Sequence, residues 1–158
     1  MLVIRTKLPT SYAYTSYAGV GGLNGRTSRS KNYELTKRTQ IKRHSEVILW
    51  IEENDSRQSS LAGFTFGENL GAWEFRDAPS PPNFSDQGWW DSPATFHLNS
   101  STFSFAEGHA INRKWLDAAT IAYSSSTDPS KYSSSPSPAQ CPRDLYFVAK
   151  GYATTSNP

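Results

Sequence analysis

Two stretches in the first third of the chain carry the hydrophobic pattern of β-strands. Residues 32–42 alternate, with Tyr33, Leu35 and Ile41 on one parity and five polar residues on the other. A period of two with this Thr content predicts a strand that has one wet, basic face. Residues 46–52 (EVILWIE) form a short apolar run with β-branched members, and its length favours a buried strand over a helix.

Two β-hairpins are predicted further along the chain. Residues 64–66 and 73–75 flank a turn that contains Gly, and residues 96–98 and 103–105 flank Asn99–Thr102. Each arm places two large apolar side chains on one face and a polar side chain on the other. The Gly and Asn residues supply the positive φ angles that hairpin turns require.

The remaining pattern predicts one helix and a closing strand. Residues 109–123 carry apolar side chains at spacings of three and four, which is typical of an amphipathic helix. Residues 124–142 hold eight Ser and four Pro and are expected to form a surface loop. The run at 144–150 (DLYFVAK) fits a last strand, and its return after so long a loop implies non-local pairing. We therefore expect a mainly β fold, an antiparallel β-sandwich of jelly-roll type with one short helix.

The composition agrees with one folded domain that follows a polar arm. The chain has 158 residues, of which 36% are hydrophobic and 13% aromatic, so it can build a small core that is rich in rings. The segment before residue 32 is rich in Gly, Ser and Tyr and has few branched apolar side chains. The expected division is a basic N-terminal arm at 1–31 and a β-sandwich domain at 32–158, with the Ser/Pro-rich loop at 124–142.

Positive charge is concentrated at the start of the chain. Residues 1–43 contain nine Lys and Arg against Glu34 alone, whereas the other 115 residues contain seven cations and thirteen acids. A basic leader on a mildly acidic body indicates a polyanion as partner, because Lys and Arg neutralise phosphates and release counterions. A solvated tail, or a basic strand edge that discourages aggregation, is the plainer alternative. The candidate nucleic-acid contacts are Arg5, Lys7, Arg26, Arg29, Lys31, Lys37, Arg38, Lys42 and Arg43.

Two adjacent tryptophans stand out in residues 78–93, a Pro-rich stretch that cannot form a central strand or helix. One ring of Trp89 and Trp90 is expected to close the end of the sandwich. The other would lie at the surface and stack on a sugar or a base, or contact a neighbouring subunit. The plainer alternative uses both rings as core and lid.

The other aromatic residues divide into core and candidate contacts. Three tryptophans on periodic apolar faces are expected in the core: Trp50, Trp73 and Trp115. Three tyrosines lie near the cations of the arm and are candidates for stacking or for docking on a neighbouring subunit: Tyr12, Tyr14 and Tyr17.

Residues with catalytic or metal-binding potential are few. His44, His97 and His109 are scattered, and the single Cys141 cannot form an internal disulfide. His97 and His109 could meet Asp91 or Glu107 in space, although nothing in the spacing requires it. Residues 107–114 combine an acid, an imidazole, an amide and two cations, which a metal-dependent nuclease could use as a weaker alternative. We expect no catalytic residues, no metal and no cofactor.

These observations favour a binding or structural role over catalysis. No apolar stretch approaches the roughly 20 residues of a membrane span, and the first residues do not resemble a signal peptide, so we expect an intracellular or virion location. The leading hypothesis is a non-catalytic assembly subunit, such as a viral coat-like protein, that associates with itself and contacts nucleic acid through its arm. The alternative is a carbohydrate-binding β-sandwich in which a loop tryptophan stacks on a sugar, with hydrogen bonds from Asn83, Asp86 and Asp91.

Overall fold

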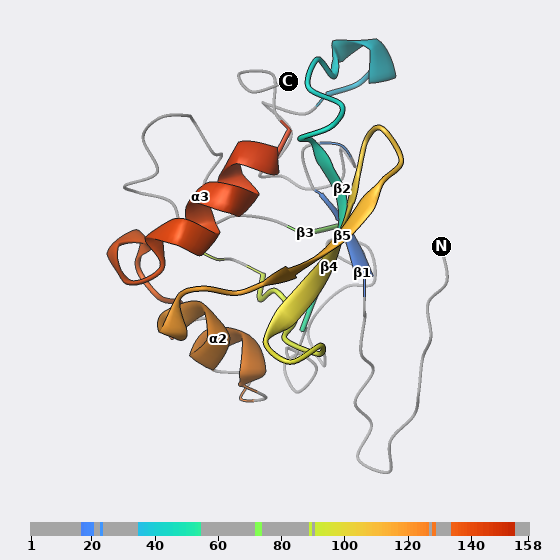
Figure 1. Cartoon of the computed structure of the whole chain (residues 1–158). Coiled ribbons are helices and arrows are strands. Elements are labelled where there is room, and N and C mark those ends of the chain that lie inside the picture. Colours follow the sequence, from blue (N-terminus) through green and yellow to red (C-terminus); the bar gives the residue numbers. More distant parts are fainter. Residues whose placement is uncertain are drawn as a thin grey trace, which may run out of the picture.

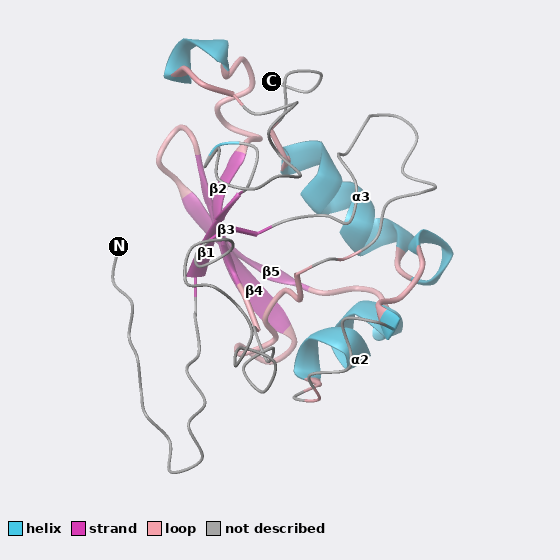
Figure 2. Ribbon diagram, turned by 180° about the vertical axis from the view of Figure 1, so that it is seen from behind, coloured by secondary structure: helices cyan, strands magenta, loops and turns pink. Residues whose placement is uncertain are grey.

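A computed structural model describes residues 17–20, 23, 35–54, 72–73, 89, 91–126, 128 and 134–153. In this part of the chain one β-sheet carries two short α-helices on one of its faces (Figures 1 and 2). The mainly β, largely antiparallel character expected from the sequence is therefore confirmed. The predicted first hairpin falls mostly on residues outside the described part, as does the Pro-rich stretch.

Five strands form the sheet, in the order β3-β1-β2-β4-β5. The pairs β1–β2, β2–β4 and β4–β5 are antiparallel, and the two-residue β3 runs parallel to β1. The bounds are Tyr17–Val20 for β1, Ile48–Glu52 for β2, Ala72–Trp73 for β3, Ser100–Phe105 for β4 and Ala110–Lys114 for β5.

Helix α2 (Ala118–Ser125) and helix α3 (Pro142–Gly151) lie on the same side of the sheet (Figures 1 and 2). Two short 3-10 turns accompany them, η1 (Arg38–Gln40) and η4 (Pro138–Gln140). Pro142 occupies the first turn of α3, where the missing N–H costs nothing.

The main core lies between the sheet and α3. Phe103 of β4 is completely buried, and its ring meets Phe147 of α3 edge to face at 5.2 Å between centroids. The ring of Trp115 packs edge-on against Phe103 at 5.7 Å and against Trp89 at 6.0 Å. Such aromatic pairs add about 0.5–1.5 kcal/mol each beyond the area that they bury. The sequence correctly placed Trp115 in the core.

The strand predicted at 46–52 is confirmed as β2, whereas the strand predicted at 32–42 is wrong over its described residues. Residues 35–46 form an irregular segment around η1. The side-chain oxygen of Gln40 accepts the N–H groups of Thr36 and Lys37 at 2.9 and 2.7 Å. This local hydrogen bonding closes a turn where an alternating pattern had indicated an extended chain.

The second hairpin was predicted with the wrong partner. Residues 96–98 form a turn, and the strand at 100–105 pairs with β5. Leu98 and Asn99 have positive φ angles of 54° and 63°, so the chain reverses before the predicted turn. Asn tolerates this left-handed conformation better than most residues.

Two predictions near the C-terminal end are corrected. The helix predicted over 109–123 is split, because residues 110–114 alternate in exposure and form β5, and only the later part is helical. The closing strand predicted at 144–150 is helix α3, in which Leu145, Val148 and Ala149 share the buried side at helical spacing. A short apolar run does not distinguish a buried strand from a buried helix.

The predicted arm is also corrected in part. Residues 17–20 belong to the expected arm, yet they form β1, an inner strand between β3 and β2. Val20 is buried in the core. The predicted boundary at residue 31 therefore does not separate the arm from the sheet, and the cations predicted at residues 5–31 lie outside the described residues.

Candidate functional site

The irregular residues 35–46, which we call the basic segment, precede β2 and lie beyond its end in Figure 1. Leu35 and Ile41 are buried and anchor the segment in a small apolar cluster with Val47 and Ala153. Its polar side chains consequently project outward. Three exposed cations belong to this segment: Lys37, Arg38 and Lys42.

These three cations have no carboxylate within ion-pair distance in the part of the chain that the structure describes. Arg43 differs, because its Nη1 donates to Glu46 Oε2 at 2.8 Å and its Nη2 donates to the carbonyl oxygen of Lys150 at 3.2 Å. Arg43 thus ties the basic segment to the end of α3. Of the four predicted nucleic-acid contacts that the structure describes, Arg43 is the one with hydrogen bonds to both Glu46 and Lys150.

Glu46 links the same two elements. Its Oε1 lies 3.2 Å from Lys150 Nζ, on the opposite oxygen from Arg43. The hydrogen bond from Lys150 is the main reason why the pKa of Glu46 is lowered, and Arg43 adds to the effect. Glu46 therefore pairs with two cations, one from the basic segment and one from α3.

Most acidic side chains of the described residues are buried. Five of the eight are buried: Glu52, Glu53, Asp91, Asp117 and Asp144. Within the described residues, the acidic body that the sequence indicated thus keeps five of its eight carboxylates away from the surface. The exposed cations of the basic segment face solvent with little acidic competition from these residues.

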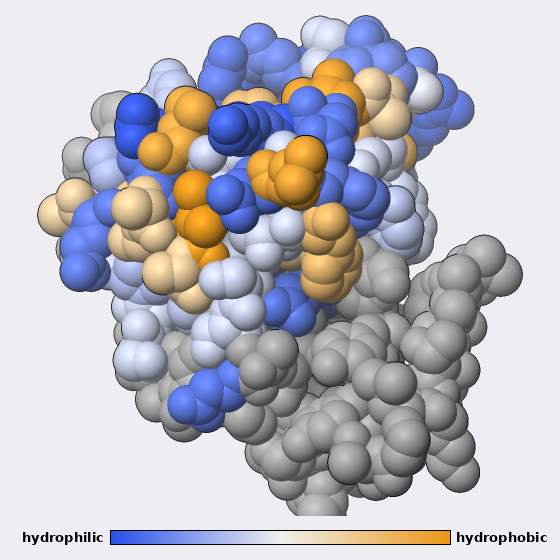
Figure 3. All heavy atoms as spheres, turned by 60° about the horizontal axis from the view of Figure 1, so that its bottom comes forward, coloured by the Kyte–Doolittle hydropathy of each residue, from blue (hydrophilic) through white to orange (hydrophobic). Residues whose placement is uncertain are grey.

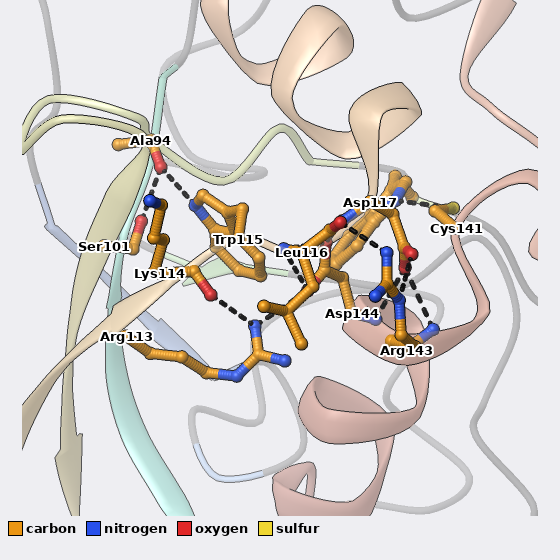
Figure 4. Close-up of polar contacts among 11 residues, drawn as sticks. Ala94, Ser101, Arg113, Lys114, Trp115, Leu116, Asp117, Cys141, Arg143 and Asp144 are labelled. Carbon is orange, nitrogen blue, oxygen red and sulfur yellow. Dashed lines mark hydrogen bonds and ion pairs between the residues drawn. The ribbon is translucent and has the colours of Figure 1, made fainter.

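Two of the buried acids share one network with two arginines (Figure 4). Asp144 Oδ1 accepts Arg113 Nη1 at 2.8 Å, and Asp144 also accepts the N–H groups of Leu116 and Asp117. Asp117 Oδ1 accepts Arg143 Nε at 2.7 Å, and Asp117 Oδ2 accepts the N–H of Arg143 at 2.9 Å.

The network is structural in character. Burial alone would raise the pKa of Asp117, but the backbone N–H groups of Asp144 and Arg143 and the Arg143 guanidinium lower it overall. Both carboxylates accept hydrogen bonds from backbone N–H groups and from an arginine, and they hold the N-termini of α2 and α3 together. Sequence analysis did not single out either acid, because their partners lie 26 to 31 residues away along the chain.

Trp89 is completely buried, with its Nε1 3.3 Å from Cys141 Sγ. It closes the core, as one of the two loop tryptophans was expected to do, and cannot serve as a stacking surface. Asp91, which the carbohydrate alternative named as a hydrogen-bonding group, is buried as well. Trp90, Tyr12 and Tyr14 lie outside the described residues.

Cys141 is a buried free thiol. Burial raises its pKa to about 11, so the thiol is neutral near pH 7. It packs as a small apolar side chain beneath Trp89.

Two other aromatic residues are exposed on the sheet. Tyr17, a predicted stacking residue, has 46% of its surface exposed, and Trp50, which was expected in the core, has 39% exposed. Trp50 is exposed because the register of β2 places it on the face that points away from the helices, opposite Ile51. The continuous apolar run around Trp50 concealed this, since it shows no clear alternation.

Two of the three histidines, His97 and His109, each lie beside an acid. His97 Nε2 lies 3.0 Å from Glu52 Oε1, and His109 Nδ1 lies 2.9 Å from Glu107 Oε1. The ring of His109 also stacks on Phe105 at 4.4 Å. The sequence left a contact of His109 with Glu107 open and did not require it, and the structure shows this contact; His97 pairs with Glu52, an acid that was not considered. Within the described ranges no three His, Cys, Asp or Glu side chains converge as metal ligands would.

Comparisons with known proteins do not assign the chain to a family. No family model, curated protein or solved structure matches it. Neither of the two α-helices that the structure describes is long and apolar enough to cross a membrane.

Proposed function

We propose that the chain is a non-catalytic structural or assembly subunit, such as a viral coat-like protein, whose basic residues contact nucleic acid. The observation that carries this proposal is the contrast between exposed cations and buried acids. Lys37, Arg38 and Lys42 are exposed without an ion-pair partner among the described residues, while five of eight described acids are buried.

The physical basis is electrostatic. When exposed Lys or Arg side chains bind phosphates, condensed counterions are released. The resulting gain in binding free energy is largely independent of base sequence. The anchored basic segment holds three such cations within six residues, on a short turn that is fixed to the core at Leu35 and Ile41. Their side chains can therefore follow a phosphate backbone without unfolding the segment.

Exposed apolar side chains support the assembly part of the proposal. Phe96 and Leu98, which flank His97, lie in the turn before β4, with 50% and 93% of their surfaces exposed. A phenylalanine and a leucine at the tip of a turn are suited to contact a neighbouring subunit. Figure 3 shows other apolar residues scattered among hydrophilic ones on the face seen there.

Several parts of the expected architecture belong to the same proposal. The sandwich or jelly-roll arrangement expected from the sequence is one of these parts. Self-association and a virion or intracellular location follow from the proposed assembly role.

Binding of a fluorescent single-stranded oligonucleotide, measured over a range of salt concentrations, tests the nucleic-acid role. The variant Lys37→Gln/Arg38→Gln/Lys42→Gln should bind more weakly and reduce the slope of log K against log salt by up to about 2, from about 0.7 per phosphate contact. The variant Lys37→Arg/Arg38→Lys/Lys42→Arg keeps the charges and should retain the slope. Equal slopes for the Gln variant and the wild type would refute the proposed role of these cations.

A further inference from the structure

The side of the sheet opposite the helices carries an aromatic and polar surface, which we call the outer face. Side chains alternate between the faces of a sheet, so directly paired residues share a face. The register of the described strands then assigns to it Tyr17, Gly19, Trp50, Glu52, Ser100, Thr102, Ser104, Ala110, Asn112 and Lys114. Both helices leave this face uncovered (Figures 1 and 2).

Trp50 lies in the middle of this face with small neighbours on both sides. Its direct partners are Gly19 on β1 and Ser104 on β4, and Ala110 follows Ser104 on β5. None of these side chains is large enough to cover an indole. Trp50 accordingly keeps 39% of its surface exposed, although β2 is the central strand. An indole held in this way offers its ring surface to a ligand.

Tyr17 provides a second ring on the same face. It pairs with Glu52, two residues from Trp50, so the two aromatic residues occupy diagonal positions on adjacent strands. Such positions lie about 7–8 Å apart, within reach of large side chains. This spacing suits two consecutive bases of an unpaired strand, each stacked on one ring.

Glu52 fixes the polar part of the outer face. Its side chain is buried and accepts the N–H of Thr102 at 2.8 Å, with His97 Nε2 at 3.0 Å. The pKa of Tyr17 is raised by burial, and further by the charge of Glu52 and a hydrogen bond to it. The carboxylate thus orients the phenol and is itself occupied, so it presents no free acceptor to a ligand.

The exposed charge on the outer face is positive. Lys114 and Asn112 of the edge strand are exposed, and Lys114 has no ion pair with a described residue. The outer face therefore offers two aromatic rings, an amide and a cation, while its carboxylate is already hydrogen-bonded. This set favours a ligand with planar groups and negative charge. A neutral sugar is less suited, because its hydroxyls would need free acceptors.

We propose that the outer face binds single-stranded nucleic acid, with one base stacked on Trp50, the next on Tyr17 and a phosphate beside Lys114. This deepens the proposed function and rests on it. The basic segment leads directly into β2, so one strand of nucleic acid would contact the segment's cations and then cross the sheet at Trp50.

Anisotropy titrations of the full chain with a labelled oligothymidylate test the inference, with an unlabelled β-glucan oligosaccharide as a competitor. Trp50→Ala should weaken binding by about tenfold or more, as expected for a lost base–aromatic stack, and leave the salt slope unchanged because no charge is removed. Trp50→Phe keeps a ring and should recover part of the affinity. Tyr146→Ala, which removes an exposed ring from α3 on the opposite side of the sheet, is the matched control and should bind as the wild type.

The outcomes separate this inference from the proposed function. If the affinity of Trp50→Ala for the oligothymidylate lies within twofold of the wild-type affinity, the role of the outer face is overturned, whereas the role of the basic segment is retained. No binding by the wild type would overturn both. If the oligosaccharide displaces the oligothymidylate from the wild type but not from Trp50→Ala, the outer face is a sugar site and the inference is overturned. A thermal unfolding curve for each variant shows whether the fold is intact.

Discussion

Asp117 and Asp144 each hold the N-terminus of the helix to which the other belongs. Asp117 is the N-cap of α2, yet its carboxylate accepts the N–H groups of Arg143 and Asp144 in the first turn of α3, at 2.9 and 3.0 Å. Asp144 in turn accepts the N–H of Asp117 at 2.9 Å. Helix N-termini favour negative charge, so this exchange stabilises both helices and fixes their junction.

Loss of the Asp144 carboxylate should therefore be costly. In Asp144→Ala, Arg113 and two backbone N–H groups lose their acceptor in a fully buried position. We expect the free energy of unfolding to fall by about 3–5 kcal/mol, as for other broken buried pairs. Urea denaturation gives the value. Asp128→Ala, at an exposed acid, is the control and should change stability by less than about 0.5 kcal/mol; similar losses in the two variants would contradict the structural role.

The lowered pKa of Asp117 makes part of the stability depend on pH. The pKa of Asp117 is lower in the folded state than in the unfolded state. Its contribution to the free energy of unfolding is therefore fully present above the unfolded pKa of about 4 and is lost as the pH falls through the folded pKa. The difference in unfolding free energy between the wild type and Asp117→Asn should therefore narrow below about pH 4. Urea midpoints from pH 7 to pH 3 measure it, and a constant difference would count against the assignment.

Gly151 lets the end of α3 approach β2 closely. A Cβ at this position would lie 2.5 Å from Ile48 Cδ1 and 2.6 Å from Ile48 Cγ1. Gly→Ala in a helix usually stabilises by about 1 kcal/mol, but here we expect Gly151→Ala to destabilise by about 1–3 kcal/mol through overpacking.

A double-mutant cycle checks the cause. Ile48→Val removes the nearer methyl, so Gly151→Ala should cost less in that background than in the wild type. Strictly additive effects, or a stabilising Gly151→Ala, would show that the close approach does not limit this position.

Cys141 should be protected in the native protein. Its thiol is completely buried, and burial raises its pKa to about 11. We expect no reaction with a disulfide reagent at pH 8 on a timescale over which the urea-unfolded chain reacts fully.

Because the folded pKa exceeds the unfolded value of about 8.5, the thiol's contribution to stability should persist below pH 8 and decline toward pH 11. Cys141→Ala should therefore lose less stability than the wild type as the pH rises toward 11. Rapid labelling of the thiol in the native protein would contradict its buried position.

The sequence predicted those parts of the fold in which one short pattern determines the structure. Residues 46–52 were recognised as a strand because the apolar run is short and β-branched, and Trp115 was recognised as core. The run at 144–150 has a similar composition but is helical, and the cue was Pro142, which begins α3. Local patterns alone could not decide between these two outcomes.

The candidate sites could be predicted from the sequence only where their residues are close together along the chain. The cations of the basic segment are visible in the sequence, and three of them are exposed in the structure. The outer face depends on registers between strands, and its carboxylate at Glu52 meets His97 across 45 residues. The burial of five acids likewise follows from tertiary packing, so the charge of the surface could not be read from the charge of the sequence.

Sedimentation of the full-length chain before and after nuclease treatment tests the central claim most directly, because it measures assembly and nucleic-acid content together. The account predicts a species much larger than a monomer that carries nucleic acid and sediments more slowly once the nucleic acid is digested. A monomer free of nucleic acid, with the same sedimentation before and after nuclease, would contradict it.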